Sequence, residues 1–375
     1  MSDEWTGEGG DFISARQPSS ARRASRSEFD FINFIRRREL RRLNAQNADS
    51  SLITHHSSLL KGIGDDAAVI RQRRGFDTVI TADLLVEGVD FDLERFRTSP
   101  RDLGHKALAV SLSDIAAMGA SPSMCLLSVG VPRARWESGF LEQLYEGVFA
   151  LAARHAVNLI GGDISRTPRH VVIDSIVLGE TRRGRAVLRS GARPGDQIFL
   201  TGALGGAAAG LRLLQEGSDP KGADRRSRAL RQLMRRQTRP TPRVEWGRLL
   251  GERRLATALI DLSDGLSSDL SHLCAESGVG ASIEAALLPL DSSLKAAAFN
   301  DEDALRLALD GGEDFELLFT VRPRDVAKLP LEVEGVRLTR VGAVTAERGR
   351  LELLRDGRAL PLRPGGFEHF KRRGR

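Results

Sequence analysis

Acidic residues stand beside glycine or other small residues at the ends of apolar runs, at several points along the sequence. A carboxylate buried there without a partner is costly. The residues are Asp65 and Asp66 in GIGDDAAV, Asp83 in TVITADLLVEG, Asp114 in ALAVSLSDIAAMGA, Asp163 in NLIGGDIS, Asp261 and Asp264 in ALIDLSDGL, and Glu313 and Asp314 in LDGGEDFELLF. Carboxylates that share a site repel one another unless cations intervene, and oxygen-rich clusters favour hard cations such as Mg²⁺, particularly beside phosphates.

Each acid taken alone fits a helix cap or a turn as well as it fits a functional group. Asp264 lies where a strand passes into a helix in IDLSDGLSSDL, so it is a candidate cap for that helix. Asp114 is harder to explain in this way, because it shares a helical face with Ala107, Ser111 and Met118. We therefore expect its carboxylate to point toward a buried side or a cleft.

The elements that must position these acids alternate between β-rich and helical runs, which predicts a mixed α/β fold (α+β) in two domains joined near residues 180–190. In the first series the strands are expected at 78–83, 125–131 and 170–178, and the helices at 101–118 and 137–155. The second series contains the β-rich runs QIFLTG, ALIDLSDG, FELLFTV and RLTRVGAV, a helix start at 202–212, and a loop with a solvated helix at 217–239.

Local signals mark the helix ends. The helix at 101–118 follows Pro100, has Asp102 placed to accept from its first amides, and can end at Gly119. Residues 1–26 lack apolar periodicity, which predicts an extension outside the fold. Ser27 then begins an amphipathic helical pattern whose basic face is either solvated or meets an anion.

Composition bounds the class of protein. The 375 residues with 41% hydrophobic content are enough for two domains with their own cores. The 56 Lys and Arg against 50 Asp and Glu leave a net charge of +6, a weak indication of nucleic-acid binding, which would be strongly salt-dependent. Basic and acidic residues intermix along most of the chain without a DNA- or RNA-binding motif, so we expect no nucleic-acid partner.

The chain shows no pattern typical of membrane insertion or of a cysteine-based site. No apolar run approaches the roughly 20 residues of a membrane helix, and the acidic start lacks a secretory signal pattern. We expect a cytoplasmic protein without a membrane partner. Cys125 and Cys274 have no ligand spacing for zinc or an iron–sulfur cluster, so we expect both to be buried apolar side chains.

Several familiar enzyme signatures are missing. No GxxxxGK[ST] occurs, which excludes a P-loop kinase. GALGGAAAG at 202–210 lacks the GxGxxG spacing of dinucleotide sites and predicts tight helix packing instead. The absence of HRD, DFG, GxSxG and HExxH disfavours protein kinases, serine hydrolases and zincins.

Seven motifs occur in an order that resembles the thiamine-monophosphate kinases, from Phe29 to Phe370. They are GIGDDAAV, TADLLVEGVDF, HKALAVSLSDIAAMGASP, LIGGDISR, LRSGARPGDQIFLTG, IDLSDGLSSDL and GGEDFELLF. This family shares a superfamily with aminoimidazole ribonucleotide synthetase and selenophosphate synthetase. The resemblance implies a two-domain α/β chain that dimerises through its N-terminal sheet, with ATP in a cleft between the domains. The expected division is 1–26 for the extension, 27–183 for the N-terminal domain and 184–375 for the C-terminal domain.

The reaction implied by the resemblance is transfer of the γ-phosphoryl group of ATP to thiamine monophosphate, which yields thiamine diphosphate and ADP. Its nucleophile is already an anionic phosphate oxygen, so no catalytic general base is expected. The barrier lies in bringing two polyanions together, for which several Mg²⁺ ions held by carboxylates are suited.

The resemblance also assigns roles by motif. The implied metal ligands are Asp66, Thr81, Ala82, Asp83, Asp114, Asp163, Asp261 and Asp264; the ATP contacts are Gly162, Asp163, Arg189 and Ser263; the substrate contacts are Asp90, Glu313 and Phe367. Ala82 stands where the family often has a hydroxyl, so a metal contact there needs the backbone carbonyl or a water. Asp90 replaces the histidine of many relatives, and an Asp facing a phosphate is unfavourable without a bridging cation or water. Phe367 fits ordinary packing as well as stacking on the substrate.

Two alternatives remain from the sequence. A sister enzyme that uses the same ATP site on another acceptor, such as an aminoimidazole ribonucleotide synthetase-like enzyme, is the closest. Selenophosphate synthetase is disfavoured, since that enzyme relies on an N-terminal cysteine or selenocysteine and neither cysteine here falls before residue 125.

Overall fold

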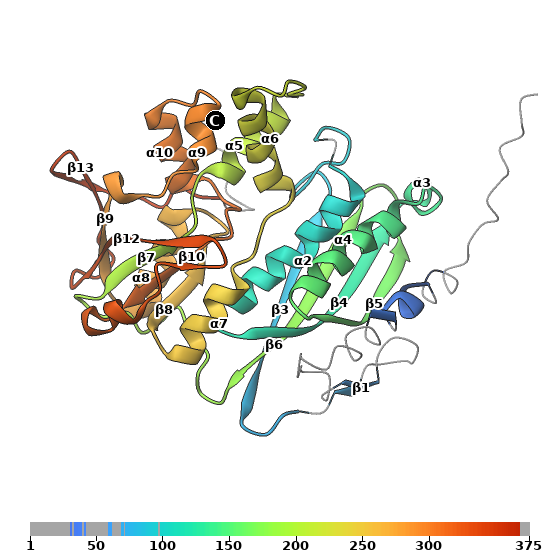
Figure 1. The fold of residues 1–375 in the computed structure, drawn as a ribbon, viewed down its shortest axis with the longest axis horizontal. Helices are drawn as coiled ribbons and strands as arrows, with labels where there is room; N and C mark the ends of the chain where they lie inside the picture. The colour runs from blue at the N-terminus through green and yellow to red at the C-terminus, as the bar shows by residue number, and fades with distance from the viewer. Residues whose placement is uncertain are drawn as a thin grey trace, which may run out of the picture.

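A computed structural model describes residues 31, 34–39, 41–42, 59–61, 69–70, 72–96 and 98–367, with only the backbone given for 59–61 and 69–70. Two sheets with their helices lie side by side (Figure 1). Residues 31, 34–39 and 41–42 are helical, as the amphipathic pattern predicts. The expected cap Ser27, the extension 1–26, and Asp65 and Asp66 lie outside the described residues.

The N-terminal sheet has four strands in the order β3-β6-β4-β5. Its strands are β3 (Phe76–Val86), β4 (Ser121–Val131), β5 (Asn158–Arg166) and β6 (Val172–Arg182). The helices are α2 (Pro100–Ala117), α3 (Arg133–Trp136) and α4 (Phe140–Arg154), and a short pair, β1 (Leu59–Lys61) and β2 (Val69–Ile70), stands apart. The three strands predicted in this part are confirmed, with ends that differ by at most four residues.

The C-terminal sheet runs β14-β13-β9-β12-β7-β10-β8, with β11 paired to β12. Its strands are β7 (Gln197–Thr201), β8 (Ala256–Asp261), β9 (Gly280–Glu284), β10 (Leu317–Val321), β11 (Glu332–Val333), β12 (Val336–Thr345), β13 (Leu351–Arg355) and β14 (Arg358–Pro361). The helices are α5 (Gly206–Gln215), α6 (Arg225–Thr238), α7 (Val244–Arg253), α8 (Leu266–Ser277), α9 (Ser292–Ala296), α10 (Asp301–Asp310) and the 3₁₀ turns η2 (Ala285–Leu287) and η3 (Pro323–Lys328). The predicted domain boundary at residues 183 and 184 falls between β6 and β7 and stays a prediction.

One helix prediction is confirmed and one cap prediction needs correction. The helix expected at 137–155 is α4, which begins three residues later, directly after Gly139 with its φ of +77°. Asp102 does not cap α2: the Ser99 hydroxyl accepts from the Asp102 amide at 3.0 Å and donates to the Asp102 carboxylate at 2.9 Å. Ser99 is the cap because it precedes the first turn of α2, where its side-chain oxygen reaches the free amides.

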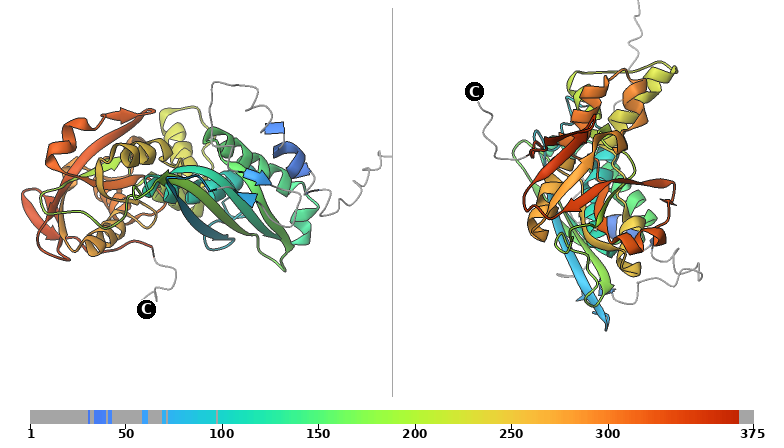
Figure 2. Two further views of the ribbon diagram at one scale, coloured as in Figure 1. Left: turned by 90° about the horizontal axis from the view of Figure 1, so that it is seen from below. Right: turned by 90° about the vertical axis from the view of Figure 1, so that its left-hand side faces the viewer.

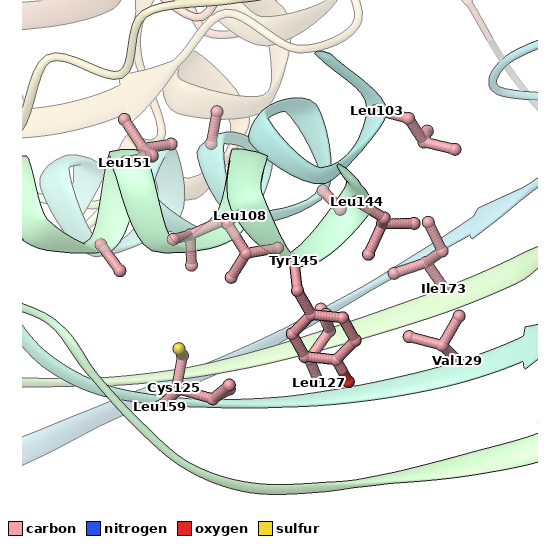
Figure 3. Packing of buried hydrophobic residues seen from close by; sticks show 14 of the residues in the cluster. Leu103, Leu108, Cys125, Leu127, Val129, Leu144, Tyr145, Leu151, Leu159 and Ile173 are labelled. Carbon is pink, nitrogen blue, oxygen red and sulfur yellow. The ribbon is translucent and has the colours of Figure 1, made fainter. Parts of the chain in front are cut away.

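Helices α2 and α4 cover one face of the N-terminal sheet and form its core (Figures 1 and 2). Leu108 and Leu144 face Leu127 and Ile173 across this layer, with Cys125 buried as predicted (Figure 3). A Cβ atom at Gly147 would lie 1.9 Å from the Arg101 carbonyl oxygen, so the glycine permits the close approach of α4 to α2. This packing fixes α2 firmly over the sheet.

Helix α2 also touches the C-terminal part of the chain. Ala116 and Ala117 at its end belong to an apolar cluster with Trp246 and Leu250 of α7 and with Phe319 of β10. The end of α2 therefore lies between the two sheets. Helix α5 packs tightly on α6, as predicted for the glycine-rich run, since a Cβ atom at Gly210 would lie 2.1 Å from the Leu233 carbonyl oxygen. Within the described chain, no helix combines the length and apolar character that membrane crossing requires.

Candidate active site

Carboxylates from three elements meet where the end of α2 lies between the sheets. Strand β3 alternates its side chains, so Thr81 and Asp83 lie on the face that the helices cover, in register with Val177 and Ser175 of β6. Asp114 extends from α2 toward them, and Asp261 ends β8. The prediction that Asp114 faces a buried side is confirmed.

Hydroxyl groups order this acidic cluster of Asp83, Asp114 and Asp261. Thr81 Oγ1 donates to the Asp114 carboxylate, Ser111 Oγ donates to Asp83 at 2.6 Å, and Ser113 Oγ donates to Asp261 at 2.7 Å. The Ser113–Asp261 bond joins α2 of the N-terminal part to β8 of the C-terminal part. The two halves of the cluster are therefore directly linked.

Burial and mutual repulsion make ionisation of the cluster costly. Burial, and then the charge of Asp114, raise the pKa of Asp83 to about 6. The same two causes raise the pKa of Asp261 to about 8. Burial also raises the pKa of Asp114, although the Thr81 hydrogen bond and the charge of Arg189 oppose it. None of the three carboxylates forms an ion pair with a Lys or Arg of the described ranges.

This donor set fits a hard cation, because its atoms are carboxylate and hydroxyl oxygens whose negative charge is not balanced. Across the described part of the chain, no three His, Cys, Asp or Glu side chains converge closely enough to hold an ion by themselves. An ion here therefore needs further oxygen ligands, such as phosphates or water. The metal roles predicted for these residues stay predictions.

A cavity of about 460 Å³ opens beside the cluster. Thr81, Asp114 and Asp261 line one side, while Leu188 and Arg189 line another. The volume lies in the range of small-molecule sites, and the walls combine apolar and charged groups as such sites do. The structure thus brings the predicted phosphate contact Arg189 to the acidic cluster.

The loop after β8 gathers the other predicted residues of the C-terminal part. The Glu313 amide donates to the Ser263 carbonyl oxygen at 2.8 Å, and the Phe367 amide donates to the Asp264 carbonyl oxygen at 3.2 Å. Phe367 is 56% exposed, so its ring is not packed in a core. Ser263, Asp264, Glu313 and Phe367 therefore lie around one loop, directly after Asp261.

Asp264 does not cap α8. Gly265 holds the cap position, and the Asp269 carboxylate accepts from the amides of Asp264 at 3.2 Å and Gly265 at 3.0 Å. Burial, and then the charge of Asp264, raise the pKa of Asp269 to about 7. The capping alternative for Asp264 is wrong, because an acid one turn into the helix takes these amides. In the sequence, the second acid of SDGLSSD, Asp269, indicates this arrangement.

Lys106 and Gln237 are site residues that the sequence reasoning missed. Lys106 Nζ lies 2.7 Å from Glu313 Oε1, and Gln237 Nε2 donates to Glu313 Oε2. Lys106 Nζ also donates to the carbonyl oxygen of Asp90 at 3.4 Å. Asp90 itself turns its carboxylate onto its own turn, where Oδ2 accepts from the Val86 amide at 2.8 Å. The side chain is thus engaged by the backbone rather than pointed at a phosphate.

Gly162, Asp163 and Ala82 do not join the acidic cluster within one chain. Asp163 is in register with Ser128 of β4, and through it with Asp174 of β6. That row lies on the opposite face from Asp83, and β5 is three strands away from β3. Ala82 likewise points its methyl group to the opposite face. The described part of the chain leaves this face of the sheet without a covering helix (Figure 2).

A buried ion pair supports the loop that carries Glu313. Arg243 Nε lies 2.6 Å from Glu316 Oε2, and the Thr201 hydroxyl donates to the same carboxylate at 2.8 Å. Asp314 accepts from the amides of Gly205 at 2.7 Å and Ala207 at 3.1 Å, at the start of α5. These contacts fix the segment on both sides of Glu313. They were not predicted, since the partners lie 73 to 115 residues away in sequence.

Comparison with known proteins gives a consistent result. Residues 64–181 match the N-terminal domain of the AIR synthase related proteins, and residues 193–353 match the C-terminal domain. The thiamine-monophosphate kinase of Bacillus subtilis (strain 168) is 38% identical over 92% of this chain and 99% of its own length. The crystal structure of the thiamine-monophosphate kinase from Stenotrophomonas maltophilia K279a has a TM-score of 0.75 and 38% identity, over 89% of this chain and 98% of that one. A structure described as AaThiL complexed with AMPPCP and TMP has a TM-score of 0.69 and 31% identity, over 92% of this chain and 97% of that one.

Proposed function

The chain belongs to the thiamine-monophosphate kinase family, and we propose from this premise that it transfers the γ-phosphoryl group of ATP to thiamine monophosphate, forming thiamine diphosphate and ADP. The structure with AMPPCP and TMP supports ATP and thiamine monophosphate as the two substrates. The observation that carries the proposal is the unbalanced acidic cluster of Asp83, Asp114 and Asp261 between the two sheets, beside Arg189.

The residues present suit a transfer between two phosphates. The acceptor oxygen is already anionic, so no side chain has to remove a proton, and the main task is to offset the charge of two polyanions. Mg²⁺ bound by Asp83, Asp114 and Asp261 would supply that positive charge and polarise the phosphoryl oxygens. Arg189 is placed to contact phosphate oxygens through charge-assisted hydrogen bonds, and Ser263 to donate to them. Asp264 completes the proposed ligand set.

The acceptor is held by the loop next to this site. Glu313 keeps part of its side chain accessible, 28% exposed, so its carboxylate can accept from the amino group of the thiamine pyrimidine or balance the positive charge of the thiazolium ring. Phe367, 56% exposed, would stack its ring on the thiamine moiety. In this arrangement the phosphate of thiamine monophosphate extends toward the acidic cluster.

The uncovered face of the N-terminal sheet supports a homodimer. Ile80 and Leu84 of β3 are 65% and 59% exposed on this face. Two large apolar side chains so exposed on the same face of one strand are unusual. Asp163 lies on the same face, so its proposed ligand role places it at the contact between two copies. Sedimentation of wild type and Leu84→Lys tests this: the wild type should be a dimer and the variant a monomer. A monomeric wild type would reject the dimer.

The cytoplasm stays the expected compartment.

The activity test is a direct assay of purified protein with ATP, Mg²⁺ and either thiamine monophosphate or thiamine, repeated with Asp114→Ala. Thiamine diphosphate should form from the monophosphate only and not with the variant. If ATP binds in a Mg²⁺-dependent way but no thiamine diphosphate forms, the acceptor is wrong and the sister reaction on another acceptor takes its place.

A further inference from the structure

The Glu313 backbone is held in an unusual conformation. Its φ of +65° is in the left-handed region, as is the φ of +48° at Phe315, and neither residue is glycine. Such conformations cost free energy and persist where surrounding contacts enforce them, often at functional sites. Here the amides of Glu313 and Phe315 donate to the carbonyl oxygens of Ser263 and Leu262. The backbone therefore presents the Glu313 side chain in one direction.

The Glu313 carboxylate is clamped from behind by two donors on different elements. Lys106 of α2 reaches Oε1 and Gln237 of α6 reaches Oε2. The Lys106 side chain is only 3% exposed, whereas that of Glu313 is 28% exposed. A ligand can therefore meet the carboxylate but not the ammonium group. Because each carboxylate oxygen has a second lone pair, both oxygens can still accept a hydrogen bond from a ligand.

The contact between α2 and the segment after α6 has a separate link. Arg239 Nη1 lies 3.2 Å from Asp102 Oδ1, one helical turn before Lys106 on α2, and this ion pair does not involve Glu313. The amide oxygen of Gln237 does not help to hold α6 against α2, since Oε1 is buried without a hydrogen-bond partner among the residues that the structure describes. The polar contacts of Gln237 and the ion pair of Lys106 are thus directed at Glu313.

We propose that Lys106 and Gln237 are positioning residues that fix the Glu313 carboxylate for an acceptor carrying an amino-substituted, cationic heteroaromatic group. The inference rests on the proposed function and deepens it. Lys106 also ties Glu313 to the turn at Asp90 through the backbone carbonyl, so the acceptor meets a carboxylate fixed by both parts of the chain. Without the clamp, the Glu313 carboxylate would lose its orientation.

The test compares Lys106→Met, Lys106→Arg and Gln237→Leu with wild type, and uses Arg239→Met as the matched control. Calorimetry measures the Kd of thiamine monophosphate with a non-hydrolysable ATP analogue bound, and steady-state kinetics measures KM for each substrate. Lys106→Met should weaken binding and raise the acceptor KM by about tenfold to a hundredfold, as expected for a misplaced contact. The KM for ATP should change by less than about threefold, and Lys106→Arg should restore part of the affinity.

Gln237→Leu removes only one donor and should show a smaller change in the same direction, which keeps the test valid if Lys106→Met does not fold. Arg239→Met should lower the Tm without raising the acceptor KM. In a Glu313→Gln background, Lys106→Met should have little further effect on affinity. An unchanged Kd in both clamp variants, or an equal rise in Arg239→Met, overturns the proposal. Wild type that binds thiamine monophosphate without phosphorylating it refutes the proposed function alone, whereas wild type that does not bind it refutes both.

Discussion

The two ends of the α2 segment from Lys106 to Asp114 carry opposite kinds of charge arrangement. Asp114 belongs to three partly or fully buried carboxylates that form no ion pair with a described Lys or Arg, whereas Lys106, eight residues and about 12 Å earlier, is matched to Glu313. Both ends contact the C-terminal part of the chain. The negative charge of the carboxylates around Asp114 has no paired cation among the described side chains to balance it, whereas Lys106 and Glu313 balance and orient each other. One helix therefore separates the proposed site for metal and phosphate from the proposed site for an organic group.

The largest expected effect comes from removing the central charge of the acidic end. Asp114→Asn should reduce thiamine diphosphate formation by at least about 10³-fold, because the transferred phosphoryl group loses electrostatic stabilisation. Without Mg²⁺, the same change should raise the free energy of unfolding by about 1 kcal/mol, since it relieves repulsion with Asp83 and Asp261. Product assays and urea unfolding measure the two effects.

A loss of both activity and stability in Asp114→Asn would contradict this interpretation, because it would make Asp114 a structural residue. Ser113→Ala is the matched control on the same turn. It removes the hydroxyl that donates to Asp261 and should cost stability without abolishing the activity.

The second prediction concerns the buried Arg243–Glu316 ion pair, which supports the loop that carries Glu313. Arg243→Met should lower the free energy of unfolding by about 3 to 5 kcal/mol, because it leaves the fully buried Glu316 carboxylate with only the more distant Arg236, 4.0 Å away, as a charged partner. Arg248→Met, which breaks the exposed pair with Glu245, should cost at most about 1 kcal/mol. Chemical unfolding of both variants gives the comparison. Equal small losses would mean that Thr201, Arg236 and water are sufficient partners for the Glu316 carboxylate.

Local periodicity predicted the strands and the direction of Asp114, because helical spacing places that residue on the same face as buried neighbours. The resemblance, rather than the spacing, supplied the set of residues around Asp261. The cap was assigned to Asp102 rather than Ser99 because two polar side chains three residues apart can both reach the first amides of a helix, and only the backbone geometry decides between them.

The clamp on Glu313 could not be predicted in the same way. Gln237 and Glu313 are 76 residues apart, and they meet only because α6 and the loop before β10 dock beside α2. A buried Lys in a helix gives a weak sequence signal, as its long stem fits an apolar face. The face of Asp163 was equally hidden, because it depends on the register of β5 and on the irregularity between Cys125 and Leu126.

Two groups of titratable side chains, the histidines His105 and His155 and the carboxylates Asp83 and Asp261, should respond oppositely to pH. Burial lowers the pKa of His105 and of His155 to about 4, with Arg154 and Arg239 adding to the effect at His105 and Asp102 and the Pro240 carbonyl opposing it. Their contribution to stability is present above pH 6.5 and is lost as the pH falls through 4. The raised pKa values of Asp83 and Asp261 stabilise the fold at low pH, and that contribution is lost as the pH rises through 6 to 8.

Urea unfolding without Mg²⁺ from pH 4 to 8.5 measures this contrast. His155→Gln should reduce the loss on the acid side by about 2 kcal/mol and leave the alkaline side unchanged. His170→Gln, at an exposed position, should alter neither side. An alkaline loss that persists in Asp261→Asn would show that the acidic cluster does not cause it.

The smallest effect is expected at Asp90, whose backbone carbonyl accepts from Lys106. Asp90→His should keep or improve activity on thiamine monophosphate, because it removes a negative charge near the Lys106 end. It should cost about 0.5 to 1.5 kcal/mol of stability, since Oδ2 no longer accepts from the Val86 amide. Asp90→Asn keeps that acceptor and removes only the charge, so it separates the two causes. A loss of activity in Asp90→His comparable to Asp114→Ala would instead make the carboxylate part of the site, held to the acceptor phosphate through a cation.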